Sequence, residues 1–206
     1  AFACLSAARG ELRRVILIGP SHHVRFDGVA VSRALAFETP LGPVPVDLDR
    51  VEKLLGSGRA IALEVAHVSE HALEVELPFL IETLGSFSIV PLVTGRAPAG
   101  EVADVLELAG AGEPDTLVVV SSDLSHYHSD DVAKAMDRET ARSIEHLRPL
   151  TTDRACGHVA INGLIELARR RALSLRAIDV RTSADTVGDP TRVVGYGAFA
   201  AFPRED

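Results

Sequence analysis

Hydrophobic residues in this chain fall into short continuous runs, separated by segments in which they recur at helical spacing. The continuous runs predict six strands, at residues 15–19, 29–32, 87–93, 116–121, 173–180 and 193–202. The helical spacing predicts five helices, at residues 47–55, 69–84, 99–108, 130–147 and 153–171. Strands that alternate with helices of this length indicate βαβ units. We therefore predict an α/β fold, in which a mostly parallel central sheet has helices on both faces.

Two of the predicted strands, VILIG and TLVVVSS, are apolar without interruption, as a strand buried on both faces should be. The segment FETPLGPVPVD breaks the alternation, and its three prolines predict a loop or an edge ribbon. The sequence contains neither a GxGxxG motif after the first strand nor a GxxxxGK[ST] motif. A functional site is therefore expected at the carboxyl ends of the strands, where open α/β sheets bind ligands.

Composition narrows the class of protein. With 29 acidic and 21 basic residues, the 206-residue chain has a net charge of −8, which argues against a nucleic-acid surface. The basic run at residues 169–171 is best explained as the end of a helix. No apolar run approaches the ~18 residues of a membrane span. Two cysteines, Cys4 and Cys156, are too few for a disulfide framework, so we expect a cytoplasmic protein. The chain length predicts a single domain over residues 1–206, and the lack of a long apolar run predicts no membrane partner.

Histidines gather where predicted elements begin and end. His22 and His23 follow the first strand, and the stretch SSDLSHYH follows the fourth. Imidazole is the commonest metal ligand and titrates near neutrality, so a shared site is one interpretation. A turn whose imidazoles face solvent is the alternative. Because side chains alternate along an extended chain, at most one of the adjacent pair is expected to face a given site.

Asp123 and His126 are spaced so that a carboxylate could lie beside an imidazole, fixing its tautomer and raising its basicity. Capping of a turn explains Asp123 equally well, and Ser129 or Asp130 is the expected N-cap of the next helix. Cys156 is either a small buried hydrophobe or, near a helix start, a thiolate of lowered pKa that binds metal or acts as a nucleophile. Its neighbour Gly157 weakens a helix, which close approach of the backbone to a ligand would explain.

The segment EHALEVELP adds a further candidate surface. His71, Glu74 and Pro78 fall on one helical face at spacings of three and seven residues. Pro78 predicts a kink or a helix start nearby. A solvated face is the alternative interpretation of the glutamates.

Together these stretches resemble the Memo family. The resemblance covers residues 13–202, and the motifs that carry it appear in the family's order: ILIGPSHHVRFDGVAV, FETPLGPVPVD, EHALEVELPFL, VPLVTG, VVVSSDLSHYH, ACGHVAINGL and DVRTSADTVGDPTRVVGYGAFA. Memo proteins resemble the class III extradiol non-haem iron dioxygenases in fold and in the position of their pocket. The resemblance thus implies an extradiol-dioxygenase-like single domain.

The resemblance also implies roles for individual residues. His22 would be a metal ligand, and Cys156 would take the place of the dioxygenases' carboxylate ligand. Asp123 and His126 would line the same pocket, with His126 as the acid–base histidine. His71 and Glu74 would form a second shell or the pocket wall.

Family members carry an earlier strand ending in Pro-His-Ala-Gly-Tyr, whose histidine is another ligand, and this sequence contains no such segment. The resemblance therefore implies iron or copper at an incomplete site that can stay metal-free. It implies redox chemistry on a small substrate. The alternatives are a pocket that binds a peptide or ligand without turnover, which would need a positive patch around Arg25 or Arg192, and a thiol hydrolase that uses Cys156 with His126 as base. Substrate, metal and oligomeric state stay open.

Overall fold

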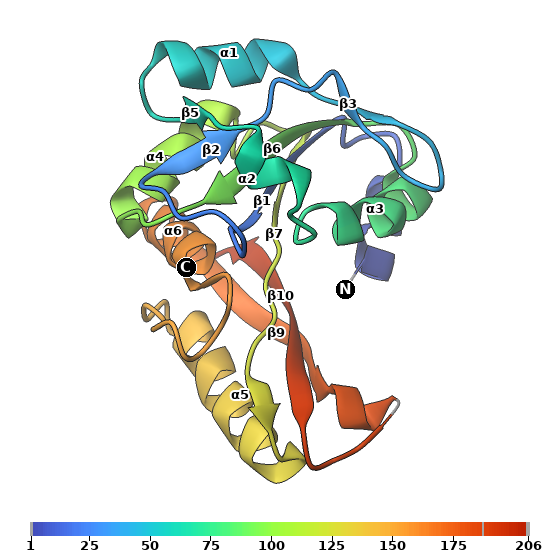
Figure 1. Ribbon diagram of the computed structural model, residues 1–206, viewed down its shortest axis with the longest axis vertical. Helices are drawn as coiled ribbons and strands as arrows, with labels where there is room; N and C mark the ends of the chain where they lie inside the picture. Colours follow the sequence, from blue (N-terminus) through green and yellow to red (C-terminus); the bar gives the residue numbers. More distant parts are fainter. Residues whose placement is uncertain (1, 187, 205–206) are drawn as a thin grey trace.

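The centre of the molecule is a five-stranded sheet. We describe it from a computed structural model, which covers residues 2–186 and 188–204. The strand order is β5-β2-β6-β1-β7 (Figure 1). The strands are β5 (Ile61–Ala62), β2 (Val29–Val31), β6 (Ser88–Thr94), β1 (Arg14–Pro20) and β7 (Thr116–Val120). β1 pairs in parallel with both β6 and β7, whereas β2 pairs antiparallel to β6. The predicted α/β class with a mostly parallel central sheet is confirmed.

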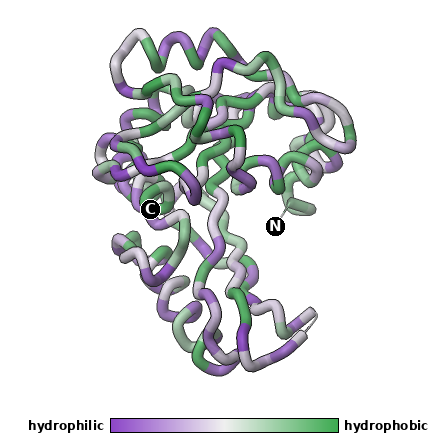
Figure 2. Tube along the Cα trace, in the orientation of Figure 1, coloured by the Kyte–Doolittle hydropathy of each residue, from purple (hydrophilic) through white to green (hydrophobic). Residues whose placement is uncertain are grey.

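Helices flank this sheet and bury its apolar strands. α1 (Leu48–Gly56), α4 (Ala99–Ala109) and α6 (His158–Arg170) lie side by side, and α6 contacts β1 and β7. The 3-10 helix η1 (Phe2–Ala8) contacts α3 (Leu77–Leu84). Residues 15–18 of β1 are fully buried, as the uninterrupted VILIG run predicts. Apolar residues concentrate around these strands in Figure 2.

The last two predicted strands do not join the central sheet. β9 (Leu173–Thr182) and β10 (Val193–Pro203) pair antiparallel and form a second sheet with β8 (His126–His128). α5 (Asp130–Glu145) packs on β9 and β10, and together they make the lower part of the molecule in Figure 1. A parallel pair needs a crossover of a dozen or more residues, which segment 183–192 is too short to provide.

Two predicted helices are wrong at their amino-terminal ends. Segment 69–84 contains α3 at Leu77–Leu84, preceded by the 3-10 turn η2 (Glu74–Glu76), and Pro78 lies at the start of α3, where proline is tolerated. His71, Glu74 and Pro78 therefore share no helical face. α6 begins at His158 rather than at residue 153, because residues 153–157 form turns.

Other local predictions are confirmed. The FETPLGPVPVD segment contains the two-stranded ribbon of β3 (Ala36–Phe37) and β4 (Val44–Pro45). The basic run ends α6, where Arg170 pairs with Asp104 at 2.7 Å. α2 (Val65–Val68) is a single turn. Over the described ranges 2–186 and 188–204, no helix combines the length and the apolar character that crossing a membrane requires.

Candidate functional site

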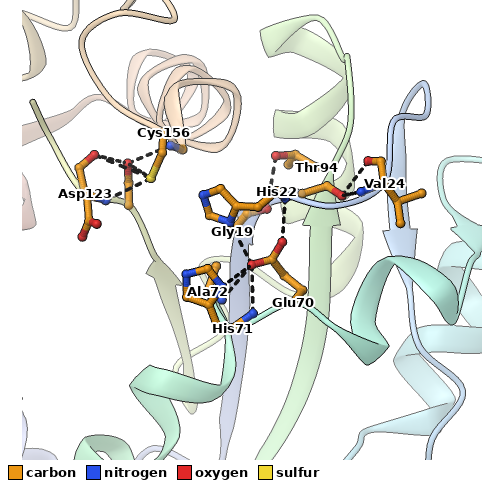
Figure 3. A network of polar contacts seen from close by, with 12 residues as sticks. Gly19, His22, Val24, Glu70, His71, Ala72, Thr94, Asp123 and Cys156 are labelled. Atoms are coloured by element: carbon orange, nitrogen blue, oxygen red, sulfur yellow. Dashed lines mark hydrogen bonds and ion pairs between the residues drawn. The ribbon is translucent and has the colours of Figure 1, made fainter. Parts of the chain in front are cut away.

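The candidate site lies at the carboxyl edge of the central sheet. β1 ends at Pro20 and β7 at Val120, and these strands are direct neighbours. His22 follows the first strand and Asp123 follows the second, so their backbones emerge next to each other. Figure 3 shows the two groups of side chains at this edge, with Cys156 beside Asp123. This placement agrees with the position predicted from the strand order.

Glu70 is the centre of the first group. Its side chain is 1% exposed, and its Oε1 accepts hydrogen bonds from His22 Nδ1 at 2.9 Å and from the backbone N–H groups of His71 at 2.9 Å and Ala72 at 3.0 Å. Its Oε2 accepts the backbone N–H of His22 at 2.6 Å. Burial alone would raise the pKa of Glu70, but the hydrogen bonds from His22 and Ala72 outweigh it, and the pKa is lowered below 4.5.

Three imidazoles form a cluster, and two of them, His22 and His71, approach this carboxylate to within 2.9 and 3.4 Å. The rings of His22 and His71 are stacked, with centroids 5.0 Å apart. The ring of His23 lies 6.5 Å from that of His22 and 6.3 Å from that of His71. Both rings of the adjacent pair thus lie near His71, contrary to the expectation that at most one of them faces a given site. Side-chain alternation applies to the strand, and β1 ends at Pro20.

Ligand atoms of His22, Glu70 and His71 all lie within 4.8 Å of one another. Imidazole nitrogens are common ligands of iron and copper, so the two rings fit a transition-metal ion, with the carboxylate placed either to complete the donor set or to hold the rings in position. Among the residues that the structure describes, no such group includes Cys156. Its assignment as a metal ligand stays a prediction.

Cys156 is the centre of the second group. Its Sγ accepts the backbone N–H of Asp123 at 3.2 Å and lies 3.7 Å from the Ser122 hydroxyl. Burial raises the pKa of the thiol above 9.0, although these hydrogen bonds act in the opposite direction. The direction of this pKa shift is opposite to that expected of a thiolate near a helix start, because burial is its largest cause.

Gly157 packs against protein rather than a ligand. A Cβ at this position would lie 2.7 Å from both the Ser121 carbonyl oxygen and the Ser122 Cβ. Its backbone N–H also donates to Ser122 Oγ at 2.8 Å. The glycine therefore allows the start of α6 to reach the end of β7, which brings Cys156 beside Asp123.

Asp123 and His126 meet as their spacing predicts. Asp123 Oδ2 lies 3.5 Å from His126 Nε2, and both side chains are partly exposed. The turn between them is fixed by hydrogen bonds to α5. The buried carboxylate of Asp137 accepts a hydrogen bond from the backbone N–H of Ser125 at 3.0 Å and another from its hydroxyl at 3.1 Å. Tyr127 adopts a positive φ of 63°, a rare conformation for a bulky residue.

Sequence reasoning missed several groups at this edge. Glu70 appears in the EHALEVELP segment without a distinguishing signal, because its side-chain partner His22 is 48 residues away in the chain. Glu76 is another: burial and the charge of Asp123 raise its pKa. Burial and the same charge raise the pKa of Tyr196. Glu74, which sequence reasoning did select, is exposed.

Comparison with known proteins shows the family of the chain. A family model described as "Memo-like protein" matches residues 1–200. The chain belongs to the Memo-like family. A MEMO1 family protein of Thermotoga neapolitana is 32% identical over 209 residues, which is 95% of this chain and 74% of the relative. MEMO1 family proteins of Aquifex aeolicus and Ignicoccus hospitalis are each 33% identical, covering 94% and 93% of this chain and 78% and 73% of their own lengths.

In this Memo-like chain, each residue implied by the resemblance has a definite place. His22 and His71 belong to the Glu70 group. Asp123 and Cys156 are in direct contact, and His126 lies at the edge of the second group. Glu74 forms no hydrogen bond or ion pair with His22 or His71 within the described ranges.

Proposed function

We propose that this Memo-like protein binds a redox-active metal ion, iron or copper, at the carboxyl edge of its sheet and carries out dioxygenase-like redox chemistry on a small substrate. The observation that carries the proposal is the pair of stacked imidazoles, His22 and His71, built on the buried carboxylate of Glu70. A ring nitrogen of each histidine would coordinate the metal ion. A bound iron or copper ion would supply one-electron and O₂ chemistry.

The protein's own groups would handle protons and substrate. Asp123 engages one ring nitrogen of His126, leaving the other to take or give a proton. A Cys156 thiol with a raised pKa has to lose its proton before it can bind metal, so its recruitment would release a proton. The two free cysteines of the described residues support a reducing compartment such as the cytoplasm.

Metal loading tests the proposal. The purified chain is incubated anaerobically with Fe(II) or Cu(I), desalted, and analysed for metal content and for oxygen uptake. We expect retained metal in the native protein, loss of metal in His22→Ala and His71→Ala, and retention in His146→Ala. His146 is a matched control, because its ring is exposed and, among the residues that the structure describes, hydrogen-bonds only to the Arg142 carbonyl on α5. A native protein that stays metal-free after loading contradicts the proposal.

One observation favours the alternative, a binding pocket without turnover. The guanidinium of Arg192 stacks on the exposed ring of Tyr127, 4.4 Å from its centroid, directly beside His126. A planar cation on an aromatic face is a surface that can receive an anionic or aromatic ligand. Binding of a peptide that requires Arg192 and survives His22→Ala would support this alternative over the metalloprotein.

A further inference from the structure

The carboxylate of Glu70 lies within reach of a metal held by His22 and His71, but both of its oxygens already accept hydrogen bonds. Three N–H groups converge on Oε1 at 2.9–3.0 Å: His22 Nδ1–H and the backbone N–H groups of His71 and Ala72. The backbone N–H of His22 takes one of the two acceptor positions of Oε2, at 2.6 Å. With its side chain 1% exposed, Glu70 also has little surface from which to reach an ion.

The same hydrogen bonds decide the tautomer of His22. Oxygens that accept from three backbone N–H groups are acceptors, so the contact with His22 Nδ1 requires that nitrogen to donate. In the neutral imidazole, Nε2 is then left with its lone pair free. It points away from Glu70, toward the side on which Figure 3 shows Asp123 and Cys156.

From these contacts we propose that Glu70 is a positioning residue and not a ligand: it holds His22 as the Nδ1–H tautomer, with Nε2 presented to the metal. This role rests on the proposed function, because the group that meets Nε2 is taken to be the proposed metal ion. Metal-bound histidines commonly donate their second N–H to a carboxylate, which fixes ring orientation and basicity. Because Glu70 also holds the backbone of His71, it sets the spacing of both imidazoles.

The first measurement needs no metal. Histidine-selective ¹⁵N labelling and NMR of the metal-free protein report which ring nitrogen carries the proton. We expect His22 as the Nδ1–H tautomer in the native protein and in Glu74→Gln, the matched control with an exposed carboxylate four residues away. Glu70→Gln should mix the tautomers, because an amide replaces one acceptor oxygen by a donor. Finding the Nε2–H tautomer in the native protein overturns the proposal.

The second measurement separates positioning from ligation. Co(II) is titrated into each variant, with affinity and the visible ligand-field spectrum recorded. A positioning residue predicts that Glu70→Gln binds Co(II) about 10–100-fold more weakly and, at saturation, gives the native spectrum. A changed spectrum at saturation means that Glu70 is a ligand and overturns the proposal. Glu70→Asp, which keeps the charge but shortens the side chain, replaces Glu70→Gln if circular dichroism shows that the latter is unfolded, and the same two outcomes apply.

The two measurements also distinguish the failure of the proposed function. If neither the native protein nor Glu74→Gln binds Co(II), Fe(II) or Cu(I), the proposed metal chemistry fails, whatever tautomer His22 has. If the native protein binds metal but His22 is the Nε2–H tautomer, the proposed function stands and the role of Glu70 fails.

Discussion

The two halves of the candidate site are held together by different forces. Around His22, a buried carboxylate collects N–H donors from two segments that are 48 residues apart in the chain. Around Cys156, a half-buried thiol with a raised pKa accepts one backbone N–H, and the packing of Gly157 against the end of β7 sets the geometry. Both halves stand on the ends of neighbouring parallel strands, yet one depends on charge and the other on steric fit.

This difference teaches where each half is vulnerable. Removing the acceptor at Glu70 leaves several buried donors without partners, which costs more than the loss of one hydrogen bond. The Cys156 half has no buried charge of this kind. Its stability should therefore be more sensitive to a larger side chain than to the loss of a polar group. The following changes separate these two kinds of support.

The largest effect is expected from Glu70→Ala. It leaves the backbone N–H groups of His22, His71 and Ala72 without their acceptor, partly buried in the first two and fully buried in Ala72, and the free energy of unfolding should fall by about 3 kcal/mol. Urea unfolding followed by circular dichroism measures the change. Glu74→Ala, four residues on and exposed, should stay within about 0.5 kcal/mol of the native protein. Equal effects of the two substitutions would show that Glu70 does not organise its half.

A smaller loss is expected from Gly157→Ala, which tests steric support in the other half. The new methyl group would lie 2.7 Å from the Ser121 carbonyl oxygen and should destabilise the fold by about 2 kcal/mol. The control is Gly100→Ala in α4, where the nearest atom to a Cβ is 3.6 Å away, at the end of the Arg170 side chain. That substitution should stabilise the protein by about 0.5–1 kcal/mol, since alanine favours a helix. Thermal unfolding of both variants decides whether close approach is the role of Gly157.

The halves should also respond to opposite extremes of pH. The pKa of Glu70 is lowered in the folded state, so its stabilisation is present above pH 4.5 and is lost as the pH falls through the folded pKa. The pKa of Cys156 is raised, so its contribution is present below pH 9.0 and is lost as the pH rises through the folded pKa. Unfolding free energies measured across pH should show that Glu70→Gln flattens the acid side and Cys156→Ala flattens the alkaline side. A profile unchanged by either substitution would contradict the assigned shifts.

The smallest effect concerns thiol reactivity. The thiolate is the reactive form, and burial keeps Cys156 protonated, whereas Cys4 is exposed. Iodoacetamide at pH 7 should therefore alkylate Cys4 before Cys156, as peptide mapping by mass spectrometry would show. The thiol-hydrolase alternative requires the reverse order, so faster alkylation of Cys156 would revive it.

Much of the fold follows from the sequence pattern alone. The uninterrupted VILIG run forms β1, which is buried beside the central strand β6. The TLVVV run, predicted to be buried on both faces, forms the last strand of the sheet, β7, and is only half-buried. The position of the candidate site at the carboxyl ends of these strands follows from the rule for parallel strands. The Asp123–His126 contact was also predictable, because both residues lie in one turn. Local spacing is enough where the interacting groups are neighbours in the chain.

Local spacing fails for segment 69–84. Its apolar periodicity predicts one long helix, but the Glu70 side chain accepts the N–H groups of His71 and Ala72, and Pro78 starts α3 instead of interrupting it. The segment is thereby shaped by its contact with the end of β1. Apolar periodicity indicates which residues are buried. It does not indicate which backbone N–H groups will donate hydrogen bonds to a carboxylate side chain.

The sequence by itself determined the α/β class, the edge of the sheet that carries the site, and the family. Tertiary structure alone decided that Glu70 is the hub of the His22 half, that His23 lies near His71, and that burial raises the pKa of Cys156. The physical reason is the same in each case. Hydrogen bonds and desolvation depend on atoms brought together by folding from β1, β7, α6 and segment 70–72, and no pattern within any one of these segments contains the others.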